Sequence, residues 1–234
     1  MEHAIVSREE WLDARRALLK AEKDLTRHRD EIARQRLALP MTRVDEDYMF
    51  DTSVGPQTLA DLFEGRSQLL MQHFMLGPGW KQGCKSCSFM ADHTDGMNKH
   101  LANHDVTMIA VSRAPLEEIK RFQERMGWRF NWVSSNGSSF NYDFRVSFTP
   151  EEIAEGRIHY NFGEWDMTGE EWPGISAFFR DQDGTVYHTY STYGRGVEVM
   201  MGTYGMLDLA PKGRNESSGM AWVRHHDRYD QSSG

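Results

Sequence analysis

The sequence predicts an α/β fold in which helices flank a mixed β-sheet. Three observations predict it. Two apolar runs, residues 68–76 and 106–111, do not alternate with polar residues, as is typical of strands covered on both faces. A helical segment separates these runs, and such a strand–helix–strand unit makes its two strands parallel. Residues 175–190 place Asp-Gly between two β-rich runs, which predicts an antiparallel hairpin.

The first forty residues (1–40) predict a helical arm ahead of the main domain. Ser7 and Glu10 match a capping box, in which each side chain binds the other residue's backbone N–H at the start of a helix. Apolar or small residues then recur every three or four positions, and Pro40 ends the helix. These residues are Trp11, Ala14, Leu18, Ala21, Leu25 and Ile32. A stripe this narrow suits a helix packed on its own domain, and it also suits a homodimer formed through the arm.

The main domain, residues 41–214, continues with short elements before and after the two buried strands. Thr58 is a suitable cap for a short helix, and Pro115 suits the first turn of a longer one that ends at Gly127. In chain order we expect a strand at 48–50, a turn at 55–56, a helix at 58–63, a strand at 68–76, a helix from Cys84 towards Leu101, a strand at 106–111, a helix at 116–126, a strand at 132–135, the hairpin at 175–190 and a helix at 197–207.

Two segments have no such regular pattern. Residues 136–172 are rich in glycine, asparagine and aromatic residues, and we interpret them as an insertion with a short helix at 150–154. The aromatic side chains are too many to remain in solvent, so we expect most to pack over the sheet and some to roof a pocket. The tail, residues 215–234, is polar, and we expect it to be loose until Trp222 and Val223 dock.

The composition argues against nucleic acid and membranes as partners. Lys and Arg number 27 against 35 Asp and Glu, a net charge of -8, which argues against nucleic acid because phosphate binding needs a basic surface. No apolar run approaches the roughly 20 residues of a membrane span, so we expect no membrane partner. The first residues lack a basic segment followed by an apolar one, and we therefore expect a cytoplasmic protein.

The two cysteines of the chain predict its chemistry. Cys84 and Cys87 are separated by two residues, and they follow a buried strand and a glycine-rich loop at the start of a predicted helix. Two thiols on a first helical turn can close a disulfide, and the free N–H groups at the helix end stabilise the first as a thiolate. Lys81 and Lys85 would lower the pKa of Cys84 further. The pattern is typical of a redox dithiol.

A metal site is the alternative reading of the same motif. A Cys-x-x-Cys pair is half of many zinc sites, but the second half is usually another such pair or a histidine pair. The chain has no second cysteine pair, although His93, His100 and His104 follow, the last two on one face of a helix. The dithiol reading requires no metal and no other cofactor, whereas a metal-holding domain would use Cys84 and His100.

Several segments resemble one protein family, DUF899, from about Trp11 to Trp222. This family is thioredoxin-like, and its members are described as dithiol–disulfide oxidoreductases. The resemblance implies a thioredoxin-like fold for this chain and a thiol-based redox activity. The segments that carry it are Gly79–Phe89, which contains both cysteines, Val111–Pro115, Met126–Trp128, Phe140–Phe144 and Tyr190–Tyr193.

The resemblance also implies roles for individual residues. Cys84 matches the attacking thiol of thioredoxins and Cys87 the resolving thiol, while His73 matches the buried acid beside the resolving thiol. Pro173 or Gly174 lies near the position of the cis-proline that faces the disulfide in thioredoxins. Arg113 follows the second buried strand, and the carboxyl ends of parallel strands share one edge of a sheet, so it could bind an anion or a thiolate there. The residues expected to contact substrate are Trp80, Lys81, Arg113, Pro173 and Gly174.

The sequence departs from thioredoxins at the motif. Trp80 is not adjacent to Cys84, no proline lies between the cysteines, and the loop before them is longer. The peroxiredoxin pattern is absent as well, because Lys81 occupies its hydroxyl position. We therefore expect a thiol–disulfide oxidoreductase acting on a protein or small-molecule disulfide. The alternatives are a peroxiredoxin-like peroxide reductase, in which Arg113 polarises the peroxide, and a non-enzymatic redox-sensing or metal-holding domain.

Overall fold

The computed structural model describes residues 3–166 and 169–229, and the chain divides into two compact units at Pro40. The first unit contains one long helix, α1 (Arg8–Leu37). The predicted capping box is present: the Ser7 hydroxyl accepts from the Glu10 N–H at 3.3 Å, and the Glu10 carboxylate accepts from the Ser7 N–H at 2.9 Å. No residue of α1 is buried.

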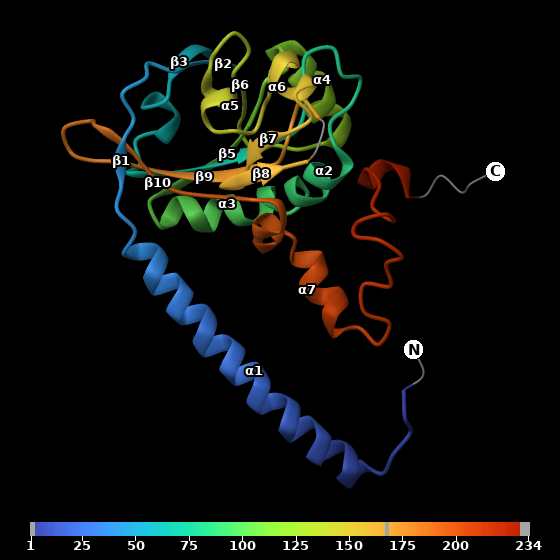
Figure 1. Ribbon diagram of the computed structural model, residues 1–234. Coiled ribbons are helices and arrows are strands. Elements are labelled where there is room, and N and C mark those ends of the chain that lie inside the picture. Colours follow the sequence, from blue (N-terminus) through green and yellow to red (C-terminus); the bar gives the residue numbers. More distant parts are fainter. Residues whose placement is uncertain (1–2, 167–168, 230–234) are drawn as a thin grey trace. The chain divides into compact units, whose positions relative to one another are not determined.

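The second unit is built on a mixed sheet that, in the described part of the chain, has eight strands in the order β1-β10-β9-β4-β5-β6-β2-β3 (Figure 1). Strands β4, β5 and β6 are parallel, whereas β9 runs antiparallel to β4 and β10 antiparallel to β9. The strands are β1 (Thr42–Arg43), β2 (Met49–Thr52), β3 (Gly55–Thr58), β4 (Gln68–His73), β5 (Val106–Ser112), β6 (Trp132–Ser134), β9 (Gly174–Arg180) and β10 (Val186–Tyr193). The predicted mixed sheet is thereby confirmed.

Helices and one hairpin cover this sheet, with α3 on one side and α5 on the other (Figure 1). The helices are η1 (Asp61–Phe63), α2 (Lys85–Ala91), α3 (Thr94–Asn103), α4 (Leu116–Met126), α5 (Phe140–Asp143), α6 (Pro150–Ala154), η2 (Gly194–Met200), α7 (Gly202–Leu209) and η3 (His226–Arg228), where η marks a 3₁₀ helix. The hairpin is β7 (Ile158–Tyr160) with β8 (Gly163–Trp165). No helix of the described residues is long and apolar enough to cross a membrane.

The single helix expected from Cys84 to Leu101 is two helices, α2 and α3. The break lies at Asp92 and His93, whose side chains bind other parts of the chain. Asp92 accepts a hydrogen bond from the indole of Trp128 at 2.8 Å. The His93 ring is hydrogen-bonded to the Phe89 carbonyl at 2.8 Å and to Thr203 at 2.9 Å. The helix expected over 197–207 is likewise divided, into η2 and α7.

Successive side chains of β4 point to opposite faces of the sheet, and each face has its own hydrophobic core. Leu69 and Met71 point to one face, where they pack with Phe140 of α5 and Phe178 of β9. The opposite face carries the apolar side chains of α2 and α4, together with Phe74. The cysteine helix therefore lies on one defined face of β4, and neighbouring residues of that strand face opposite surroundings.

Candidate functional site

Cys84 and Cys87 lie at the start of α2 as free thiols. Cys84 is the N-cap residue, and its backbone N–H donates to the carbonyl of Met75 at 3.0 Å, which ties the helix start to the segment that follows β4. The Ser88 hydroxyl donates to the Cys84 carbonyl at 2.9 Å and secures the first turn. Cys84 is half-buried and Cys87 fully buried, so an incoming group reaches Cys84 first.

The surroundings shift the pKa values of the two thiols in opposite directions. The pKa of Cys84 is lowered to about 6, chiefly because the Cys87 thiol donates a hydrogen bond to its sulfur. Backbone N–H groups of Cys87 and Ser86 and the Ser86 hydroxyl lower that pKa further, and together these donors outweigh burial. Burial, and then the neighbouring Cys84, raise the pKa of Cys87 well above its ordinary value. The lysines expected to act on Cys84, at positions 81 and 85, are not among the causes.

Gln72, rather than His73, faces the cysteine helix. The Gln72 amide is buried and donates to the carbonyl of Cys87 at 3.2 Å. His73, the next residue of β4, lies on the other face, where its ring stacks against Phe140 and Phe144. The expectation that His73 sits beside the resolving thiol is therefore wrong. Neighbouring residues of a strand point to opposite faces of the sheet, and it is Gln72 that points towards α2.

His73 belongs instead to a buried chain of polar side chains. Its Nε2 is hydrogen-bonded to Ser176 Oγ at 2.7 Å, Ser176 to Ser191 at 2.8 Å, and Ser191 to His188 Nε2 at 2.7 Å. Burial, and then His188, lower the pKa of His73 to about 3, so its ring is neutral. This chain links β4, β9 and β10 on the face away from the thiols.

The loop before the cysteines depends on Gly83. A Cβ at this position would lie 2.5 Å from the ring of Phe74 and 2.8 Å from that of Phe122, so only glycine fits. The Gly83 carbonyl accepts a hydrogen bond from Nε2 of the buried His225, which comes from the C-terminal tail. Core packing on one side and the tail on the other thus hold the residue that precedes Cys84.

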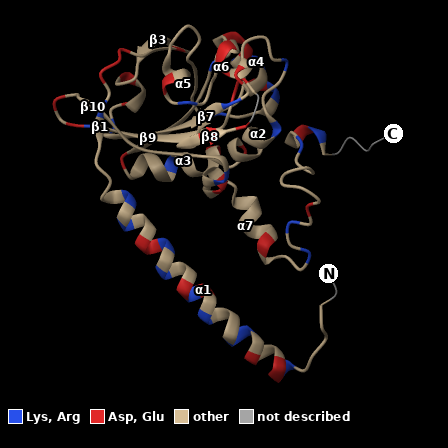
Figure 2. Ribbon diagram, viewed as in Figure 1, with Lys and Arg blue, Asp and Glu red and all other residues tan. Residues whose placement is uncertain are grey.

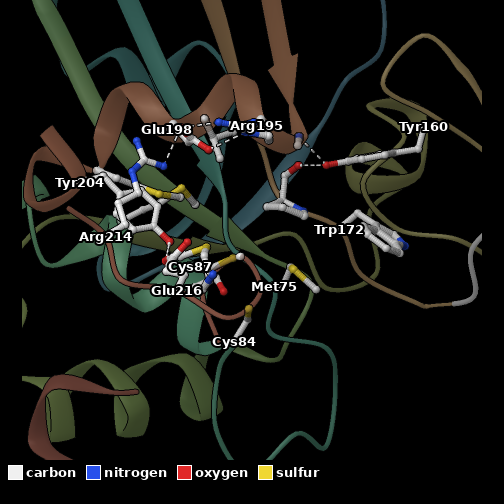
Figure 3. Close-up of a pocket in the computed structure, with 18 of the residues that line it drawn as sticks. Met75, Cys84, Cys87, Tyr160, Trp172, Arg195, Glu198, Tyr204, Arg214 and Glu216 are labelled. Atoms are coloured by element: carbon white, nitrogen blue, oxygen red, sulfur yellow. Dashed lines mark hydrogen bonds and ion pairs between the residues drawn. The ribbon is translucent and has the colours of Figure 1, made fainter. Parts of the chain in front are cut away.

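A cavity of 610 Å³ opens beside the two cysteines. In Figure 3, Tyr160 and Trp172 lie on one side of the thiols, and Tyr204 with Arg214 on the other. Its aromatic and sulfur-containing walls come from segments far apart in the sequence. They are Met75, Met90, Tyr160, Trp165, Trp172, Met201, Tyr204 and Met220, with Arg195, Glu198, Arg214 and Glu216 as the charged members.

The insertion supplies one wall of this cavity. Tyr160 of β7 donates its hydroxyl proton to the Pro173 carbonyl at 2.6 Å and accepts from the Gly194 N–H at 2.9 Å. Pro173 lines the cavity, but no peptide bond in the described residues is cis, so Pro173 differs from the cis-proline of thioredoxins. Gly174 lies next to it and pairs with His73 across β4 and β9. A Cβ on Gly174 would lie 2.7 Å from the Tyr193 ring.

The C-terminal tail supplies another wall. Glu216 accepts hydrogen bonds from the Tyr204 hydroxyl at 2.5 Å, the Trp222 indole at 2.7 Å and the Met220 N–H at 3.2 Å. The Arg214 guanidinium stacks on the Tyr204 ring, 4.0 Å from its centre. Trp222 and Val223 dock as expected, but the tail is already attached at Arg214 and Glu216, which corrects the expectation of a loose segment before Trp222.

The other residues expected to contact substrate do not line this cavity. Arg113 donates through Nε to Glu171 at 2.7 Å and also pairs with Glu170, so acidic side chains already neutralise it. Burial raises the pKa of Glu171, against the opposing effects of the Ser147 hydroxyl and Arg113. Trp80 packs against the core on the α2 side, and Lys81 is exposed.

The role of Gln72, and which aromatic residues of the insertion matter most, do not follow from the sequence. The excess of aromatic residues did indicate a roof over a pocket, but only the fold shows that Tyr160, Trp165 and Trp172 form it. Nothing in the sequence singles out Glu216. Among the residues that the structure describes, no group of three His, Cys, Asp or Glu is placed to hold a metal ion.

The arrangement of the strands defines the fold type. Strands β6, β5 and β4 are parallel, β9 and β10 follow antiparallel beside β4, and the cysteine helix comes directly after β4. This is a thioredoxin-like fold, as the resemblance implied.

Among solved structures, the chain is similar to the peroxidoxin BcpB from Mycobacterium tuberculosis, with 14% identity, a TM-score of 0.45 and coverage of 70% of this chain and 96% of that one. Peroxiredoxin Q from Xanthomonas campestris matches with 10% identity, a TM-score of 0.46 and coverage of 70% and 95%. A Chlorobium tepidum protein considered to be the thiol:disulfide interchange protein DsbE matches with 12% identity, a TM-score of 0.41 and coverage of 70% and 97%.

No curated protein matches the chain. The family described as "Bacterial protein of unknown function (DUF899)" matches residues 1–229. Because this match spans nearly the whole sequence, the chain belongs to the DUF899 family.

Proposed function

We propose that this protein is a thiol–disulfide oxidoreductase in which Cys84 attacks a substrate disulfide and Cys87 resolves the product. The observation that carries this proposal is the placement of the pair: Cys84 is accessible at the start of α2 beside a cavity, with Cys87 buried behind it. A dithiol needs this division between an exposed nucleophile and a protected second thiol.

Two displacements make up the reaction. The Cys84 thiolate attacks one sulfur of the disulfide, forms a mixed disulfide with that half and releases the other half as a thiolate. Cys87 then loses its proton to the departing thiolate and attacks the Cys84 sulfur, which closes the Cys84–Cys87 disulfide and releases the second half. The substrate gains two electrons and the protein loses two, so an external thiol reductant must regenerate the dithiol.

The acidities of the thiols support this order. With a pKa of about 6, Cys84 is mostly thiolate at neutral pH, while the raised pKa of Cys87 keeps that thiol protonated until it is needed. The hydrogen bond from Cys87 to Cys84 disappears once the Cys84 sulfur enters a mixed disulfide. Cys87 can then release its proton more readily, so the first step prepares the second.

The cavity indicates what kind of disulfide enters. Its volume of 610 Å³ lies within the roughly 300–1,000 Å³ typical of small-molecule sites. Aromatic rings and methionine side chains make most of its wall, and such surfaces favour apolar or aromatic groups. We therefore propose a disulfide that carries an apolar or aromatic group, on a small molecule or on a protein side chain.

A single-turnover assay with 4,4′-dithiodipyridine tests the two-thiol scheme, because each displacement releases one coloured thiopyridone. The pre-reduced protein should release two equivalents and end as the intramolecular disulfide. Cys87→Ser should release one equivalent and remain as a mixed disulfide visible by mass. Cys84→Ser should react far more slowly. A wild-type protein that ends with one thiopyridine attached to each cysteine and no intramolecular disulfide, or an unchanged rate from Cys84→Ser, would refute the scheme.

The same variants separate the proposal from peroxide reduction. If hydrogen peroxide were the substrate, Cys87→Ser would accumulate a sulfenic acid at Cys84 as fast as the wild-type protein consumes peroxide. Arg113 is paired with Glu171 and does not line the cavity, so the expected arginine is not directed at a bound peroxide. We expect slow peroxide consumption, unchanged in Arg113→Ala.

A further inference from the structure

We propose that α1 forms a parallel, two-stranded coiled coil with α1 of a second copy of this chain. The proposal concerns the arm alone, and it is independent of the redox chemistry. Its starting point is that α1 exposes large apolar side chains. Trp11 is 46% exposed, Leu18 55% and Leu25 50%, and no residue of the helix is buried.

These side chains form a regular seam. Trp11, Leu18, Leu25 and Ile32 recur every seven residues, which is the spacing of the a positions in a coiled coil. The intervening d positions are Ala14, Ala21, His28 and Gln35. A strict seven-residue repeat along the helix is the pattern of a helix that packs against another helix. The small alanines allow a close approach, and the two polar residues favour one register.

Charged residues beside the seam determine which helix can pair with α1 and whether the two helices run parallel or antiparallel. Three of the four g positions, which precede the seam, hold acidic residues: Glu10, Asp24 and Glu31. Arginine stands five residues after each of them, at the e positions 15, 29 and 36, whereas the fourth g position holds the uncharged Ala17. In a parallel pair each g residue faces the e residue five positions later on the other helix, so all three pairs join opposite charges. Figure 2 shows both signs distributed along the whole of α1.

An antiparallel pair is disfavoured by the same residues. Antiparallel helices bring g positions opposite g and e opposite e, which would set Glu10 against Glu31 and Arg15 against Arg29. Asp24 and Glu31 already form ion pairs within the helix, with Arg27 and Arg34, but such exposed pairs are weak and can exchange. Because one sequence supplies both halves of every favourable pair, the matching partner is a second copy of the same chain.

Cysteine cross-linking tests both the partner and the direction. In full-length protein carrying Cys84→Ser and Cys87→Ser, Ala14→Cys places a thiol on the seam, where a parallel partner brings the same residue opposite. Oxidation should then give a covalent dimer. The matched control, Ala33→Cys, lies at the outward b position and should remain monomeric on a denaturing gel. A dimer that cross-links through Ala33→Cys but not Ala14→Cys would overturn the proposal.

Charge reversal tests the pairing across the seam. Light scattering should give a dimer for the wild-type chain. Glu31→Lys should weaken it about tenfold, because two attractive pairs become repulsive. Adding Arg36→Glu should restore the wild-type dissociation constant, and Lys23→Glu, on the outward f position, should leave it unchanged. A monomer at about 100 μM, a larger assembly, or no effect of Glu31→Lys would each refute the proposal.

Discussion

Two neighbouring cysteines in this protein differ because of what surrounds each sulfur. Cys84 receives hydrogen bonds from the Cys87 thiol and from backbone N–H groups at the start of α2, whereas Cys87 is enclosed in the core. The donors stabilise a negative charge on Cys84, and the enclosure disfavours one on Cys87. The nucleophile is thus assigned by local geometry, even though the two side chains are chemically identical.

The lowered pKa of Cys84 predicts how its rate of alkylation depends on pH. A lowered pKa means that Cys84 gains its charge as pH rises through about 6, so its alkylation by iodoacetamide should rise through that pH and level off near neutrality. Cys87→Ala removes the largest cause of the shift and should move the midpoint upward. The hydrogen bonds that the Cys84 thiolate accepts also stabilise the reduced fold. Because the thiolate becomes protonated as pH falls through the same midpoint, that stabilisation is lost there. A midpoint near the ordinary value of about 8.5 would contradict the assignment.

The close packing around Gly83 predicts how a substitution at this residue changes the stability of the protein. Gly83→Ala should destabilise the protein by about 1–3 kcal/mol, because the new methyl group would overlap the rings of Phe74 and Phe122. Gly96→Ala, in α3, is the matched control, since a Cβ there has no atom within 4 Å. That variant should be neutral or slightly stabilising, as expected of alanine in a helix. Equal chemical denaturation curves for the two variants would argue against the packing.

At the scale of elements, the cavity is an assembly of the cysteine helix, the β7–β8 hairpin, the η2–α7 segment and the tail. Each contributes part of a wall, and hydrogen bonds join them: Tyr160 links the hairpin to Pro173 and Gly194, and Glu216 links the tail to Tyr204. The tail is therefore part of the site, although its sequence is polar and lacks a regular pattern.

Glu216→Ala tests this role of the tail. The variant loses the acceptor for Tyr204, Met220 and Trp222, so hydrogen exchange at residues 216–222 should become faster, while exchange in β4 and β5 stays unchanged. An aromatic disulfide should also show a higher KM with little change in kcat. Glu164→Ala, at an exposed position of the β7–β8 hairpin, serves as control. Unaltered tail exchange in Glu216→Ala would show that other contacts hold this segment.

The elements that the sequence predicted well are those specified by short-range patterns. The capping box of α1, the buried strands, the Asp-Gly hairpin and the position of the cysteines at a helix start all follow from local spacing. His73 was misplaced because alternation on a strand covered on both faces leaves no polar side from which to read the phase. The break between α2 and α3 and the attachment of the tail before Trp222 depend on contacts with distant residues, such as Trp128 and Tyr204, which local patterns do not contain.

For the whole molecule, the division at Pro40 predicts that the two units have separate roles. A chain that begins at Met41 should keep the thiol chemistry, because every described residue that lines the cavity belongs to the second unit. Its Cys84 alkylation midpoint should remain near pH 6, while the dimer disappears in light scattering. A shifted midpoint would mean that the arm contributes to the site.

A redox titration of the reduced protein in glutathione buffers, with free thiols counted by alkylation and mass, shows directly whether Cys84 and Cys87 form a redox-active pair. A Cys84 pKa near 6 stabilises the reduced pair at neutral pH about tenfold relative to an ordinary thiol, which raises the reduction potential by roughly 30 mV. We predict a reversible transition between two and zero free thiols, at a potential between roughly −230 and −120 mV. A pair that stays reduced throughout this range, or that loses one thiol at a time, would contradict the account.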